Sequence, residues 1–220
     1  IRNGAGHPGG PAVEIEGLGA KLSIDGGTIK GGPGYGAVSG NGSLSSTKNS
    51  GGTEIQISGG VIQGVAHNYD GGFQSGNGIY HPQAGKLNIT GGEITGDTGI
   101  EMRAGDVNVS GNAVIRGTMT PTTVKPEGNG STSDGVGLAI AQHSTKLPIN
   151  VSVSGGTIEG YSALYESNPE KNPAESIAAV TMDIMGGTFN AISGGAVAVY
   201  SEDCSSFISG GTFSSDPSAY

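Results

Sequence analysis

The stretch KLNITGGEITGDTGIEMRAG, residues 86–105, alternates hydrophobic and polar residues in three short runs that are separated by glycine. A period of two is typical of β-strands, in which successive side chains point to opposite faces. Glycine bends the chain sharply without a steric penalty. We therefore predict that this stretch forms one complete turn of a β-solenoid, with three strands and three corners.

Inside this turn, every second residue of each strand is expected to point into the solenoid. The expected inward side chains are Leu87, Ile89, Ile94, Ile100 and Met102. The polar residues between them are expected to point outward, and Glu101 and Arg103 are the charged members of the third strand. His81 takes an inward position on the third strand of the preceding turn, so we predict a hydrogen-bonded core histidine rather than a ligand.

The rest of the chain repeats this unit with insertions of variable length. The glycine corner after the first strand recurs at 26–27, 59–60, 91–92, 111–112 (Gly-Asn), 155–156, 186–187 and 210–211. The shortest step is 20 residues and the others are longer, as expected for loops added to a stacked coil. Crossovers between parallel strands are nearly always right-handed. We predict an all-β fold: a single right-handed parallel β-helix over residues 1–220, with about seven coils of three short strands.

Composition agrees with a solenoid and excludes several other classes. The 44 glycines and 10 prolines recur with the period of the corners, and only Ala174 to Val180 has the pattern of a helical turn. The net charge of −9 argues against nucleic acid and anionic membrane as partners. No apolar run is long enough to cross a membrane, and no signal peptide is present. The single cysteine, Cys204, excludes internal disulfides.

The chain begins inside a coil, because residues 12–16 read as a third strand without the first two. We interpret the chain as a domain excised from a longer exported protein. The end coils of such a domain carry unpaired strand edges, which favour end-to-end self-association.

The repeat pattern over nearly the whole chain resembles the right-handed parallel β-helix group that includes the pectate-lyase-like proteins. The endings GGTFNAISGGAVAVYS (186–201) and ISGGTFSSDPSAY (208–220) are similar to segments of large secreted or surface proteins of gut Gram-positive bacteria. This resemblance implies an extracellular or cell-surface location and contact with a polysaccharide or host glycan.

Polysaccharide lyases of this fold typically use a calcium site of clustered Asp and Glu beside an Arg or Lys base. Polygalacturonases of this fold have paired aspartates after an Asn-x-Asp, with a His-Gly and an Arg-x-Lys. Neither set occurs in the chain. The outward first-strand row is instead an amide and hydroxyl ladder with one carboxylate: Ser23, Gln56, Asn88, Asn108, Ser152 and Asp183. We predict no metal ligand, no cofactor and no assigned catalytic residue.

The best candidate surface comes from two insertions, residues 65–77 and 117–134, that leave the same corner on either side of the compact coil. We expect them to form two walls above a floor of outward side chains. Aromatic faces stack on sugar rings, while carboxylates and Arg bind hydroxyl or acid groups. The candidate ligand-binding residues are Tyr69, Asp70, Tyr80, Asp97, Glu101, Arg103 and Tyr165, with Thr95 on the same floor and Tyr200 one position further along its strand.

Three functions remain open at this point. The first is a non-catalytic extracellular module that binds glycan or presents its loops rigidly. The alternative to a binding role for Glu101 and Arg103 is that they are ordinary solvated strand-face charges. The second is a polysaccharide lyase or glycoside hydrolase, for which Glu93 and Glu101 are the candidate acid/base pair. The third is a purely structural spacer. Three or more acids converging in one groove would favour the enzyme.

Overall fold

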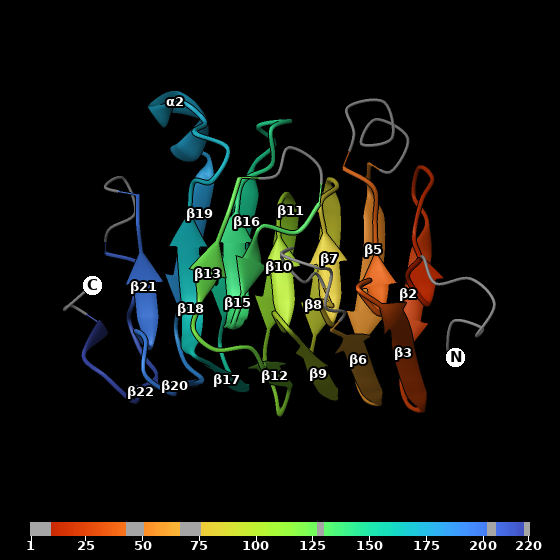
Figure 1. Ribbon diagram of the computed structural model, residues 1–220, viewed down its shortest axis with the longest axis horizontal. Helices are drawn as coiled ribbons and strands as arrows, with labels where there is room; N and C mark the ends of the chain where they lie inside the picture. Colours follow the sequence, from red (N-terminus) through yellow and green to blue (C-terminus); the bar gives the residue numbers. More distant parts are fainter. Residues whose placement is uncertain (1–9, 43–50, 67–75, 127–129, 202–205, 218–220) are drawn as a thin grey trace.

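The computed structural model describes residues 10–42, 51–66, 76–126, 130–201 and 206–217. Its coils stack along one axis, and the strands of successive coils pair in parallel (Figure 1). The chain is a right-handed parallel β-helix with three long sheets, as the repeat predicts. Each sheet collects one strand from each coil, so residues far apart in sequence become neighbours.

The three sheets are named in the order in which a coil visits them. The first sheet contains β2 (Lys21–Ile24), β5 (Thr53–Ile57), β8 (Gly85–Ile89), β11 (Gly105–Val109), β16 (Ile149–Val153) and β19 (Val180–Ile184). The second contains β3 (Thr28–Pro33), β6 (Val61–Val65), β9 (Glu93–Gly96), β12 (Val114–Gly117), β17 (Thr157–Gly160), β20 (Thr188–Ala191) and β22 (Thr212–Phe213). The third contains β1 (Val13–Glu14), β4 (Val38–Ser39), β7 (Ile79–His81), β10 (Ile100–Met102), β15 (Val136–Ala141), β18 (Ser162–Ser167) and β21 (Val197–Val199).

The core consists of columns in which like side chains stack on like. In the second sheet the inward column runs Ile29, Ile62, Ile94, Ile115, Ile158, Phe189 and Phe213. The column ends in two stacked phenyl rings whose centroids are 5.1 Å apart. Ile94 and its neighbours in the compact coil are fully buried, and each such side chain contributes roughly 1.5–3 kcal/mol of hydrophobic stabilisation. The predicted inward residues of the compact coil are thereby confirmed.

The corner after the first strand requires glycine for two reasons. Gly92 has a φ of 86°, a left-handed conformation that residues with a Cβ rarely adopt. A Cβ at this position would also lie 3.0 Å from the backbone of Gly59 in the coil below. The repeated Gly-Gly pair therefore serves both the turn and the close stacking of one coil on the next.

Three local features add to the predicted pattern. The second insertion contains a small antiparallel pair, β13 (Thr123–Val124) and β14 (Ser133–Asp134). The predicted helical turn exists as α2 (Ala174–Ile177). The third-sheet strand β18 extends to Ser167 and buries the Glu166 side chain. Its carboxylate accepts bonds from the backbone N–H groups of Tyr200 and Ser201, which explains why a charge is tolerated there.

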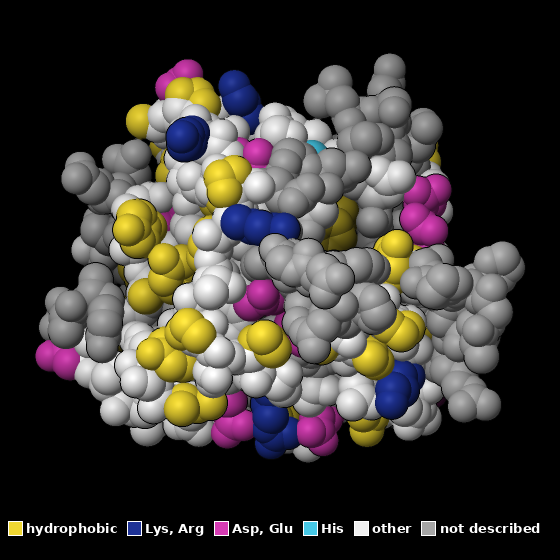
Figure 2. All heavy atoms as spheres, viewed as in Figure 1, with side chains coloured by type: hydrophobic (Ala, Val, Ile, Leu, Met, Phe, Trp, Pro, Cys, Tyr) yellow, Lys and Arg dark blue, Asp and Glu magenta, His cyan; other side chains and the backbone are white. Residues whose placement is uncertain are grey.

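Charged and apolar side chains gather on different parts of the surface. In Figure 2 charges of both signs line the lower edge, over the second-sheet strands, where Arg116 pairs with Glu93 and Glu159. Hydrophobic side chains (yellow) gather over β18 and β21 on the left of Figure 2. No helix in the described ranges is long and apolar enough to cross a membrane.

Candidate functional site

The predicted floor between the two insertions is covered rather than open. Glu101 and Arg103 have no exposed surface, and Asp97 is 2 % exposed. The cover is the described part of the second insertion, residues 118–126 and 130–134, which we call the covering segment. The strand alternation correctly places Glu101 on the outer side of the coil, because its register neighbours are Tyr80 and Ala139. The expectation that Glu101 is open to solvent is wrong, and so is the alternative that Glu101 and Arg103 are solvated charges on the strand face.

Glu101 binds the covering segment through a set of charge-assisted hydrogen bonds. Its carboxylate accepts from the backbone N–H of Thr132 at 2.7 Å and from the Thr132 hydroxyl at 2.6 Å. The other oxygen accepts from Asn77 Nδ2 at 3.1 Å, and Asn77 also donates to Ser131 Oγ at 2.6 Å. Bonds to an ionised acceptor are stronger than neutral ones, which offsets the cost of burying the charge. Glu101 therefore fastens the segment to the third sheet.

Arg103 and Tyr80 complete this attachment. Arg103 donates through Nε to the carbonyl of Ala141 at 2.9 Å, and its terminal nitrogens bond to the Gly130 carbonyl and to Glu170. The Tyr80 hydroxyl donates to the Gly130 carbonyl at 3.0 Å and accepts from the Gly130 N–H at 3.1 Å. Burial raises the pKa of Tyr80, so it stays a neutral phenol. These two candidate residues hold the covering segment in place.

Two buried aspartates lie near each other here, Asp97 under the covering segment and Asp134 within it. Asp97 accepts from the Gly76 N–H at 3.1 Å, and burial raises its pKa. Burial also raises the pKa of Asp134 to about 7, with the nearby Asp97 and Glu101 charges acting in the same direction. Asp134 is 5 % exposed and its Oδ1 atom has no hydrogen-bond partner among the described residues. Asp97, Glu101 and Asp134 are all buried, so these three acids do not line an open groove.

The remaining predicted residues take separate positions. His81 is fully buried, its Nδ1 lies 3.0 Å from the Ala104 carbonyl, and burial lowers its pKa, so the predicted hydrogen-bonded core histidine is confirmed. Thr95 is half-buried on β9 in the second sheet, and Glu93 on the same strand pairs with Arg116. Tyr69 and Asp70 lie outside the described residues.

An open hollow lies beside the covered floor, at the neighbouring coils. It has a volume of about 440 Å³. Its lining is Thr122, Val124, Tyr165, Ser167, Asn168, Pro169 and Tyr200, and we call it the tyrosine hollow. Tyr165 comes from the outward row of β18, Tyr200 follows β21 in the next coil, and the covering segment supplies Thr122 and Val124.

The two tyrosines form an aromatic pair whose ring centroids are 6.3 Å apart, with the ring planes tilted by 47°. Tyr200 is 77 % exposed and Tyr165 is half-buried, so aromatic surface faces the hollow. Partial burial raises the pKa of Tyr165, and the neighbouring Tyr200 and Glu166 add to this effect. The Tyr165 hydroxyl therefore remains a neutral hydrogen-bonding group near neutral pH. The hollow combines aromatic faces, an amide and hydroxyls, which suits a ligand with both C–H and O–H surface.

The sequence pattern named Tyr165 as an outward third-strand residue and Tyr200 as one position further along its strand, and the structure brings the two rings together. The floor between the two insertions is covered, whereas the hollow at the later coils is open, so we take the hollow as the candidate binding surface. Asn168 and Pro169, which follow β18 and line the hollow, were not among the residues predicted from the sequence. Their Asn-Pro composition, next to Tyr165, was the available signal.

The described residues contain no group of three His, Cys, Asp or Glu side chains arranged to hold a metal ion. Comparison of the chain with family models, curated proteins and solved structures found no match.

Proposed function

We propose that this protein is a non-catalytic glycan-binding module of an extracellular or cell-surface protein, with the tyrosine hollow as its binding site. The observation that carries the proposal is the pair of half-buried Tyr165 and exposed Tyr200 at an open hollow lined with Asn168 and hydroxyl groups. Sugar rings present a C–H face that packs on an aromatic ring and a rim of hydroxyls that needs donors and acceptors.

The scaffold supports this use. Tyr165 and its supporting strand are held by parallel pairing on both sides, to β15 and to β21. Glu166 fixes the backbone of Tyr200 and Ser201, so the second ring is positioned before any ligand arrives. A site that is already ordered loses less entropy on binding. The resemblance of the repeat to pectate-lyase-like proteins, and of residues 186–201 and 208–220 to secreted or surface proteins, also supports this role.

The test is a binding assay of the purified protein against soluble and insoluble polysaccharides, with the supernatant assayed for released sugars. We expect retention on at least one polysaccharide and no release of reducing or unsaturated ends. Tyr200→Ala should weaken binding about tenfold or more, since it removes most of one exposed stacking face. Tyr35→Ala, which removes an exposed tyrosine far from the hollow, is the matched control and should bind normally.

Release of sugars would make the protein an enzyme and overturn the proposal. Absence of binding to every polysaccharide would instead favour a structural spacer. Equal binding by Tyr200→Ala and the unaltered protein would show that the ligand binds elsewhere.

A further inference from the structure

The outward face of the first sheet carries two adjoining hollows, with volumes of about 530 and 660 Å³. They share the lining residues Glu54, Lys86, Asp106 and Asn150, so they form one continuous depression, which we call the amide groove. The groove crosses β5, β8, β11, β16 and β19 along the solenoid axis. It lies on a different sheet from the tyrosine hollow and shares no residue with it.

The polar side chains of the groove are oriented by bonds to one another. Thr181 donates to Asn150 Oδ1 at 2.7 Å, and Asn150 Nδ2 donates to Asp106 Oδ1 at 2.7 Å. Asn108 likewise donates to Asn88 at 2.8 Å across neighbouring coils. These ladders hold donors and acceptors at the spacing of the strands, about 4.8 Å. The outward amide and hydroxyl row expected from the sequence is present in the strand register, with Asn88 and Asn108 as a bonded pair, and the Thr181–Asn150–Asp106 ladder lies in the row beside it.

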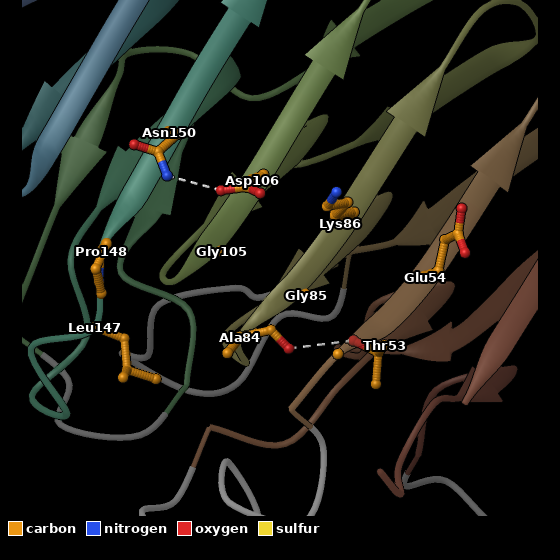
Figure 3. A pocket seen from close by; sticks show the side chains of 11 residues that line it. Thr53, Glu54, Ala84, Gly85, Lys86, Gly105, Asp106, Leu147, Pro148 and Asn150 are labelled. Carbon is orange, nitrogen blue, oxygen red and sulfur yellow. Dashed lines mark hydrogen bonds between the residues drawn. The ribbon is translucent and has the colours of Figure 1, made fainter. Parts of the chain in front are cut away.

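Lys86 interrupts the ladder. Its register neighbours are Glu54 on one side and Asp106 on the other, yet no ion pair joins it to either within the described part of the chain. Glu54 is instead bonded to Lys21 at 2.9 Å and to Gln56 at 2.8 Å, and the Lys21 bond lowers its pKa most. Figure 3 shows Lys86 between the two acids at the centre of the depression. The groove thus offers one ammonium donor flanked by two carboxylate acceptors.

The floor beside Lys86 is bare backbone. A Cβ at Gly85 would lie 2.2 Å from Thr53 Oγ1, and one at Gly105 would lie 2.6 Å from the Gly85 carbonyl oxygen. Side chains are therefore excluded where the coils stack most closely. Leu147 and Pro148 form an apolar wall at the end of the depression (Figure 3). A flat floor with an apolar wall accommodates the C–H face of a ring.

We propose that the amide groove is a second saccharide site, which takes an uncharged, hydroxyl-rich linear oligosaccharide lying along the solenoid axis. A hydroxyl group both donates and accepts, so one sugar unit can donate to Glu54 or Asp106 and accept from Lys86. An acidic polysaccharide is disfavoured, because two carboxylates surround the one ammonium and the chain carries a net charge of −9. The inference extends the proposed function, but its residues and its evidence are separate from those of the tyrosine hollow.

The test is an amide NMR titration of the full chain with neutral hexasaccharides derived from xylan, mannan and β-glucan, and with hexagalacturonate as the acidic probe. We expect a neutral probe to shift the amide signals of Thr53, Lys86 and Asp106 in a saturable manner, and hexagalacturonate to shift them less. Lys86→Ala should weaken this binding about tenfold, as expected for loss of one charged donor. Lys30→Ala removes an exposed lysine from the second sheet and should leave saccharide binding at the amide groove unchanged.

The proposal is overturned if no neutral probe shifts these signals, if only the acidic probe does, or if Lys30→Ala and Lys86→Ala behave alike. Tyr200→Ala separates the two sites, because it should abolish shifts at the tyrosine hollow and leave those at Lys86. Saturable shifts at Lys86 without any at Tyr165 would support the groove and refute the tyrosine hollow. The opposite result would refute the groove alone.

Discussion

Replacing Glu101 by alanine should destabilise the fold strongly, because this carboxylate fastens the covering segment to the third sheet. The change removes the acceptor for the Thr132 N–H, the Thr132 hydroxyl and Asn77 Nδ2. A buried hydrogen bond to a charged group is worth about 1.5–3 kcal/mol, and removing one partner leaves the other unsatisfied. Asn77 retains its bond to Ser131, so the three losses do not add fully. We expect Glu101→Ala to lower the free energy of unfolding by about 3–5 kcal/mol in total.

Urea denaturation followed by far-ultraviolet circular dichroism measures this loss. With a slope of about 3 kcal/mol per M for a chain of this size, the unfolding midpoint should fall by about 1 M or more. Glu101→Gln keeps the shape and one oxygen for the Thr132 N–H, so about 1–2 kcal/mol should be lost. The control is Asp183→Ala, which removes an exposed carboxylate from β19 and should change stability by less than about 0.5 kcal/mol.

A Glu101→Ala protein as stable as the Asp183→Ala control would refute the reasoning, because the covering segment would then be held by something other than this carboxylate. Urea denaturation also distinguishes variants that lose stability from variants that lose only ligand binding. Tyr200→Ala should weaken binding at the tyrosine hollow with little loss of stability. Glu101→Ala should lower stability first, and it should affect the hollow only through Thr122 and Val124 on the covering segment.

Two further changes test the buried acid and the coil spacing. The folded-state pKa of Asp134, about 7, exceeds the value of about 3.9 in an unfolded chain, so the contribution of this group to stability is greatest below pH ~4 and is lost as the pH rises toward 7. Asp134→Asn should therefore raise the unfolding free energy at pH 8 by about 1–2 kcal/mol and change it little at pH 4; equal effects at both pH values would contradict this assignment. Gly96→Ala would place a Cβ 2.3 Å from the Gly78 backbone nitrogen and should cost about 1–3 kcal/mol in thermal unfolding, whereas Gly26→Ala meets nothing within 4 Å and should be neutral.

The sequence was sufficient for the coil because its information is local. Alternation in residues 86–105 tells which side chains face the interior, and Ile94 and Met102 are buried as predicted. Glycine pairs mark corners because few other residues tolerate the backbone angles of Gly92. His81 follows the same rule, since its inward position already implied burial. Repetition of one unit then determines the stacking, because each coil buries its core only against its neighbours.

The candidate site could be predicted only in part. The alternation rule distinguishes inward from outward with respect to the coil, but it does not say whether an insertion lies over the outward face. Glu101 and Arg103 are outward by this rule and fully buried by the covering segment. The partners responsible, Thr132 and Gly130, are about 30 residues away in the chain and carry no motif.

What the sequence alone determined is the repeating coil, its three strands, its hydrophobic columns and its outward polar ladder, because strand period and glycine corners act within a few residues. Only the tertiary structure decided which outward residues meet solvent. Folding of the second insertion onto the third sheet converted Tyr80, Glu101 and Arg103 into internal attachments. Stacking of the coils brought Tyr165 beside Tyr200 and placed Lys86 between two acids, Glu54 and Asp106. Exposure depends on contacts between distant segments, which the local pattern does not contain.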